Sequence, residues 1–146
     1  GSPPFGLLTT HPMWRRSLIS ARGRAKTPRR ARGASDCQPF LFWRLDEHFE
    51  HYGMVYAPDL TMVPSEYFKR QCFVSVEADE MPVKYVIDYM GNEQLIFSTD
   101  YPHGDSKFPE SVDRFMGLPL TDDDRRKILW DNCAAFYKVQ NRVRAI

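Results

Sequence analysis

The chain has 146 residues, is 42% hydrophobic and 14% aromatic, and carries a formal net charge of +1. This length suits one ordinary domain or part of a larger one, and the apolar content can supply a core, which excludes wholesale disorder. No apolar run reaches membrane-spanning length and no secretion signal opens the sequence, so we expect no membrane partner. The three cysteines are an odd number at wide spacing, which predicts reduced thiols and a cytoplasmic location.

The first 36 residues differ in character from the rest. Residues 1–35 hold eight Lys or Arg and no acid, which leaves a net charge of −7 on the remainder. Because prolines, glycines and charges interrupt this stretch, residues 1–36 predict an irregular basic arm, with at most a short helix near 13–20. The arm lacks interleaved aromatic residues and a groove-reading helix, so we expect no nucleic-acid partner.

From residue 37 to residue 146 the pattern is that of a folded domain with five helices. Apolar residues at helical spacing predict a helix from Pro39 to about His51, and a second begins at Pro64. The stretch Met81–Met90 predicts a third, which Asp79 and Glu80 precede as cap and first turn. The others are a short helix at about 110–116 and a last helix from Thr121 to about Lys138, in which the apolar-face Asn132 should bond to backbone of a neighbouring segment.

Two buried strands are predicted, Cys72–Val76 and Leu95–Thr99, because both are apolar and rich in β-branched or aromatic residues. The helix between them is short, so the strands should pair in parallel with a right-handed crossover, and Gly91 should end that helix in a left-handed conformation. Two strands do not form a stable parallel sheet alone. We therefore expect the sequence to be part of a larger α/β domain.

An acid, Asp100, follows the second strand, and Pro102 and Gly104 then force a loop that carries His103. Active sites of α/β sheets and barrels lie at the carboxyl ends of their strands, where a carboxylate can bind a divalent metal or move a proton. Glu77 follows the first strand and is a candidate for the same edge. The alternative is that Asp100 only starts a turn, which is a common use of Asp.

Five segments resemble the carboxyl-terminal part of the amidohydrolase-related (amidohydrolase 2) family, which includes aminocarboxymuconate-semialdehyde decarboxylase. The resemblance covers roughly residues 38–138, and its most specific part is Ser-Thr-Asp-Tyr-Pro-His at 98–103. The segments are Arg44–His48, Pro64–Phe68, Cys72–Glu77, Phe97–His103 and Arg126–Tyr137.

The resemblance implies a (β/α)8 TIM barrel with a divalent metal, usually zinc, at the top. In such a barrel Asp100 would end the eighth strand, bind the metal and accept a proton from activated water, and His103 and Glu77 would contact the substrate or the residues that hold the metal. The family's His-x-His pair and its first five strands are absent here, and residues 1–36 do not resemble the sixth strand. The resemblance therefore implies a carboxyl-terminal barrel fragment with an incomplete metal site and an amino-terminal arm that an out-of-frame reading would explain.

Three functions follow from this resemblance. The first is a metal-dependent hydrolase acting on a small molecule, in which activated water attacks a C–N or C–O bond; the isolated chain would be inactive. The second is a nonoxidative decarboxylase (a lyase) on the same scaffold, since a fold does not fix its reaction. The third is a non-catalytic remnant, because catalytic zinc usually takes three protein ligands. A homo-oligomer is possible in each case.

Overall fold

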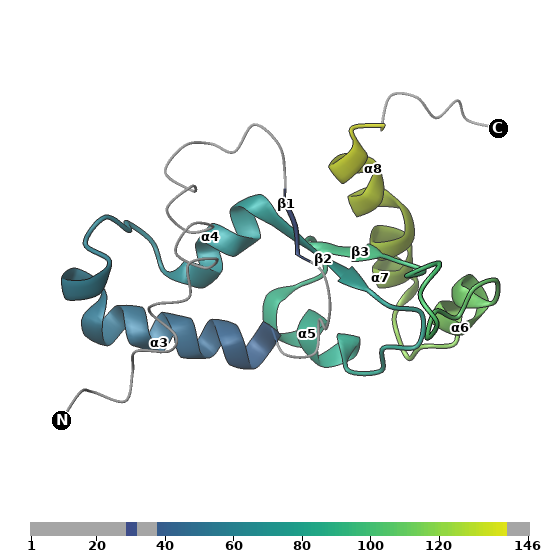
Figure 1. Cartoon of the computed structure of the whole chain (residues 1–146), viewed down its shortest axis with the longest axis horizontal. Coiled ribbons are helices and arrows are strands. Elements are labelled where there is room, and N and C mark those ends of the chain that lie inside the picture. Colours follow the sequence, from purple (N-terminus) through teal and green to yellow (C-terminus); the bar gives the residue numbers. More distant parts are fainter. Residues whose placement is uncertain (1–28, 32–37, 140–146) are drawn as a thin grey trace. The chain divides into compact units, whose positions relative to one another are not determined.

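The computed structural model describes residues 29–31 and 38–139 (Figure 1). The short helix expected near 13–20 and the thiol of Cys37 lie outside these residues. The chain divides into two compact units, one containing Phe40–Gln71 and the other Arg29–Pro39 with Cys72–Ile146. Within the described residues, no helix is both long and apolar enough to span a membrane.

The first unit contains α4 (Pro64–Gln71) and all but the first two residues of α3 (Gln38–Tyr56). Both predicted helices are confirmed, although α3 continues past the expected end near His51. The rings of Phe42 and Phe68 pack with centroids 4.7 Å apart. Asp46 of α3 accepts hydrogen bonds from the backbone N–H and the hydroxyl of Ser65, at 2.9 and 2.5 Å. This carboxylate therefore satisfies a free N–H in the first turn of α4.

The second unit is built on a parallel sheet in the order β1 (Arg29–Ala31), β2 (Cys72–Val76) and β3 (Leu95–Phe97). The bounds of β2 are as predicted, whereas β3 ends two residues early. Pairing nevertheless continues at Ser98, whose N–H donates to the Val76 carbonyl at 2.9 Å. The expectation of an irregular arm is wrong at β1: strand ladders use backbone N–H and C=O groups, so an arginine-rich segment can pair there.

Helix α5 (Val83–Met90) connects β2 to β3 and buries Val83, Val86 and Met90. It begins later than predicted, with Pro82 as its N-cap and no side-chain cap. The predicted capping role of Asp79 and Glu80 is therefore wrong. A residue before proline is disfavoured in the helical region, so Met81 stays outside the helix and the acids lie too far upstream. Gly91 ends α5 with the expected positive φ, +86°, but its ψ of 178° is extended, so the predicted left-handed cap conformation is wrong.

The remaining helices are α6 (Ser111–Met116), α7 (Asp122–Arg126), the π-helical segment η3 (Lys127–Asp131) and α8 (Asn132–Tyr137). The last three follow one another without a break, where one α-helix was predicted. Thr121 caps α7 as expected: its hydroxyl accepts from the N–H of Asp124, whose carboxylate in turn accepts from the Thr121 N–H. Both bonds satisfy N–H groups that the helix start would leave free.

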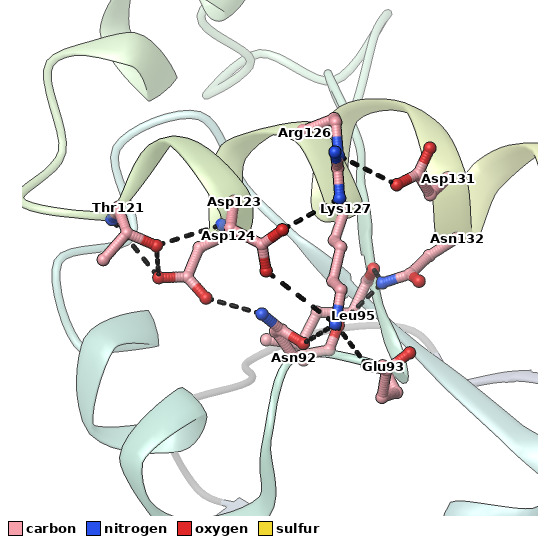
Figure 2. A network of polar contacts seen from close by, with 10 residues as sticks. All are labelled: Asn92, Glu93, Leu95, Thr121, Asp123, Asp124, Arg126, Lys127, Asp131 and Asn132. Carbon is pink, nitrogen blue, oxygen red and sulfur yellow. Dashed lines mark hydrogen bonds and ion pairs between the residues drawn. The ribbon is translucent and has the colours of Figure 1, made fainter.

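A polar network fixes the start of β3 to this last helical stretch (Figure 2). The amide of the buried Asn132 donates to the carbonyls of Asn92 and Leu95, at 2.6 and 2.8 Å, so the predicted backbone bonding is confirmed. Asn92 in turn donates to Asp124 at 2.6 Å and accepts from Lys127 at 3.2 Å. The network holds β3, and with it the loop that follows, in a defined position.

Candidate functional site

The carboxyl ends of β2 and β3 lie at the same edge of the sheet. In the parallel register, Val76 pairs with Phe97, so the chain leaves both strands at the same level. Glu77 directly follows β2, and Asp100 comes three residues after the end of β3. The fold therefore brings two of the predicted site residues, Glu77 and Asp100, to one edge.

The electrostatics of this edge are negative. The pKa of the Glu77 carboxyl is raised, first by partial desolvation at the end of β2 and then by the negative charge of Asp100. Glu80, Asp105 and Asp79 raise the pKa further. Within the described part of the chain, no cation or hydrogen-bond donor contacts the carboxylate of Glu77 or that of Asp100. Among these residues, the negative charge around Glu77 is therefore not compensated, an arrangement that favours a bound cation.

The backbone of Asp100 has a φ of +53°, in the left-handed region that Asp tolerates better than most residues. Its N–H is 3.3 Å from the Ser98 hydroxyl, and its carbonyl accepts from the N–H of His103 at 3.0 Å. The hydroxyl of Thr99 similarly accepts from the N–H of Tyr101 at 3.3 Å. The turn is thus bonded through hydroxyls and backbone, and no turn bond uses the Asp100 carboxylate.

The loop after Asp100 is held by contacts that the sequence analysis did not identify. Ser106 donates its hydroxyl to the Thr99 carbonyl at 2.7 Å, and the rings of Tyr101 and Phe108 lie 4.9 Å apart. Lys107 reaches Asp79 at 3.8 Å. The sequence signal for these loop contacts is the group of hydroxyl residues Ser98, Thr99 and Ser106, because such side chains often bond to nearby backbone.

His103 lies on this loop with an exposed side chain. Its N–H bonds to Asp100, but among the described residues no contact joins its ring to Asp100 or to Glu77. The structure therefore brings the two acids to one edge of the sheet, whereas the His103 imidazole is exposed and contacts neither acid within that part of the chain.

Metal binding at this edge needs donors beyond the two acids. No three His, Cys, Asp or Glu side chains of residues 29–31 and 38–139 cluster closely enough to hold a metal ion. Carboxylates are ligands suited to Mg²⁺, Ca²⁺ and Mn²⁺, so the chemistry of the pair would suit a hard divalent cation. A separate hollow lies on α3 and contains none of the predicted site residues; its lining is Arg44, Glu47, His48, His51 and Tyr52.

Comparison with solved structures finds similar folds among decarboxylases. The 5-carboxyvanillate decarboxylase of Sphingomonas paucimobilis has a TM-score of 0.72 and 22% identity, over 88% of this chain and 39% of that chain. The enzyme of the same name from Novosphingobium aromaticivorans, with manganese and 4-hydroxy-3-methoxy-5-nitrobenzoic acid, gives 0.71 and 17%, over 87% and 38%. The dihydroxybenzoic acid decarboxylase of Polaromonas sp., with manganese and 2-nitroresorcinol, gives 0.58 and 23%, over 73% and 32%.

This chain thus spans at most about two fifths of the length of these structures. Comparison with curated proteins finds no match. The small parallel sheet with its helices is consistent with part of a TIM-barrel amidohydrolase. A family model described as Amidohydrolase matches residues 39–139, a range that contains β2, β3, Glu77 and Asp100. On this match, which covers more than half of the sequence, the chain belongs to the amidohydrolase family.

Proposed function

We propose that Asp100 and Glu77 form part of a divalent-metal site of an enzyme that cleaves a bond in a small molecule. The observation that carries this proposal is a pair of carboxylates after the ends of adjacent parallel strands, with no cation or hydrogen-bond donor in contact with them among the described residues. A carboxylate whose hydrogen-bonding capacity is unused at a strand end is well placed to meet a cation. We further propose that β2 and β3 are strands seven and eight of a (β/α)8 barrel, whose other strands would supply the remaining ligands.

The reaction that we favour is nonoxidative decarboxylation of a carboxylated aromatic compound. All three similar structures described above are decarboxylases, and two contain manganese. When bound, a divalent metal acts as a Lewis acid that polarises substrate oxygen atoms and orients the carboxylate that leaves. The oxygen-rich donor pair fits Mn²⁺ at least as well as the Zn²⁺ implied by the sequence resemblance.

In this proposal each residue has a separate role. Asp100 binds the metal and exchanges a proton with the reacting group. Glu77, which directly follows the adjacent strand β2, contacts the substrate or a group that holds the metal. His103, exposed on the following loop, contacts the substrate or supports Asp100 through the backbone bond between them.

Hydrolysis is the second candidate reaction, and the observation that favours it is the match to the Amidohydrolase family model. The same two acids serve it, with Asp100 as the base that accepts a proton from the attacking water. Because the isolated chain contributes Asp100 as one ligand where catalytic sites usually need three protein ligands, we propose that it binds metal weakly and turns over neither substrate alone.

The test is Mn²⁺ binding by isothermal titration calorimetry of the whole chain. Wild-type protein should bind Mn²⁺, and Asp100→Asn should weaken binding by about tenfold or more. Asp113→Asn removes an exposed acid of α6 and is the matched control, which should leave binding unchanged. Equal affinity in the wild type and both variants would overturn the proposal. Release of CO₂ from 2,6-dihydroxybenzoate, with Mn²⁺ present, would overturn only the expectation that the isolated chain is inactive.

A further inference from the structure

The hydroxyl of Ser106 closes the loop that carries Asp100. It donates to the carbonyl of Thr99 at 2.7 Å and accepts from the N–H of Phe108 at 3.3 Å. Ser106 and Thr99 are both half-buried, so the first of these bonds is partly shielded from water and is stronger for it. One side chain therefore links the residue before Asp100 to the far end of the loop.

Both sequence neighbours of Asp100 depend on this hydroxyl. Thr99 is bonded to it directly. Tyr101 packs its ring against that of Phe108, with centroids 4.9 Å apart, and the backbone of Phe108 is bonded to Ser106. The Ser106 hydroxyl thus restrains the chain on each side of Asp100.

The backbone conformation of Asp100 requires such restraint. Its φ of +53° lies in the left-handed region, which is unfavourable for residues that have a Cβ atom and persists where surrounding contacts enforce it. Because φ sets the direction in which the side chain leaves the backbone, relaxation to a negative φ would turn the Asp100 carboxylate away from its present direction. Contacts that fix this backbone therefore also fix the carboxylate.

We propose that Ser106 is a positioning residue for Asp100. Its hydroxyl holds Asp100 in the left-handed conformation and so keeps the carboxylate where it binds the cation. This inference rests on the proposed function, since it gives Ser106 a role in metal binding that acts through Asp100. Loss of the hydroxyl should weaken metal binding although no ligand is removed, as is usual for residues that orient a ligand.

Titration of the whole chain with Mn²⁺ tests the proposal. Ser106→Ala should weaken binding by about fivefold, the effect of losing one hydrogen bond, whereas Ser106→Thr keeps a hydroxyl and should bind as the wild type does. Ser65→Ala is the matched control, because it removes a serine hydroxyl that is bonded to Asp46 at 2.5 Å in the other compact unit. This control should leave Mn²⁺ affinity unchanged. Equal affinity in Ser106→Ala and the wild type would overturn the proposal.

A double variant shows whether Ser106 acts through Asp100. Asn also tolerates a positive φ, so Asp100→Asn removes the negative charge and keeps the turn. In this background Ser106→Ala should cause no further loss of affinity, because the two effects are not additive when one residue acts through the other. A fivefold loss in both backgrounds would show that Ser106 acts elsewhere and would refute its positioning role.

Amide exchange without metal separates this proposal from the proposed function. The N–H of His103 donates to the Asp100 carbonyl at 3.0 Å, so its exchange with water, measured by NMR, reports the conformation of Asp100. Ser106→Ala should raise the exchange rate by about fivefold, and Ser106→Thr should not. An unchanged rate in Ser106→Ala would overturn the positioning role. If Asp100→Asn binds Mn²⁺ as tightly as the wild type, the proposed function fails, and the exchange rates still decide whether Ser106 holds Asp100.

Discussion

The side-chain amide of Asn132 donates a hydrogen bond to the backbone carbonyl of Leu95 across 2.8 Å. This bond joins the first residue of α8 to the first residue of β3. The same amide also bonds to Asn92, so one buried side chain satisfies two carbonyls at the point where the chain enters the strand. The position of the candidate site at the other end of β3 depends on this anchor.

Asn132→Ala should lower the free energy of unfolding by about 2 kcal/mol, because it leaves two carbonyls without their donor. Urea denaturation followed by circular dichroism measures the change. Asn132→Asp keeps the shape but loses the donors, and should destabilise at least as much. Asp131→Ala removes an exposed acid next to it and should cost less than about 1 kcal/mol. Equal effects of the two alanine variants would contradict the assigned role of Asn132.

The capping box at the start of α7 gives a second prediction. Thr121→Ala should cost about 1 kcal/mol of stability, since the N–H of Asp124 loses its acceptor. Thr121→Ser keeps a hydroxyl in the same place and should preserve stability. A thermal melt of the two variants beside the wild type checks this, and a Thr121→Ala protein as stable as Thr121→Ser would contradict it.

The carboxyl of Asp124 predicts how stability depends on acid. Its burial opposes ionisation, but hydrogen bonds from Thr121 and Asn92 outweigh this, so its pKa is lowered in the folded chain. A lowered pKa in the folded state stabilises the protein above the unfolded value of about 3.9. That stability is lost as the pH falls through the lower folded pKa. Asp124→Asn should reduce the loss in the free energy of unfolding that the wild type shows as the pH falls. An unchanged loss would show that other groups cause it.

Glu77 predicts the opposite dependence. Its pKa is raised by desolvation and by Asp100, so the folded chain holds this proton more tightly than the unfolded chain does. The contribution of Glu77 to the free energy of unfolding is therefore favourable at low pH. It is lost as the pH rises from about 4.3, the pKa in the unfolded chain, through the pKa in the folded chain. Glu77→Gln should therefore stabilise the chain at pH 7 and have little effect near pH 3. Denaturant midpoints at the two pH values measure this; destabilisation at pH 7 would contradict it.

The elements of the second unit that the sequence predicted well are those with a strong local signal. The apolar run Cys72–Val76 forms strand β2, and the cap at Thr121 begins helix α7. Both structures depend on residues that are close in sequence. The start of α5 was misplaced because the steric effect of Pro82 outweighs the capping preference of Asp79. Strand β1 could not be predicted, since its pairing with β2 uses backbone groups that every sequence has.

The candidate site was also predictable only in part. That Asp100 would follow a strand was evident from the pattern, and parallel pairing then implied that Glu77 would reach the same edge. The closure of the loop by Ser106 and Thr99, and the lack of any contact to the His103 ring among the described residues, depend on how the loop folds back. Contacts across a loop have no periodicity that would predict them.

We propose that the Asp100 carboxylate binds a divalent cation, with Glu77 at the same edge of the sheet. Anomalous scattering from a crystal of the whole chain grown with Mn²⁺ is the decisive test. We expect a manganese peak at coordination distance, about 2.0–2.2 Å, from an Asp100 oxygen, with Glu77 beside it. A well-ordered Asp100 without a peak at saturating Mn²⁺, or manganese bound only at other acids, would contradict it.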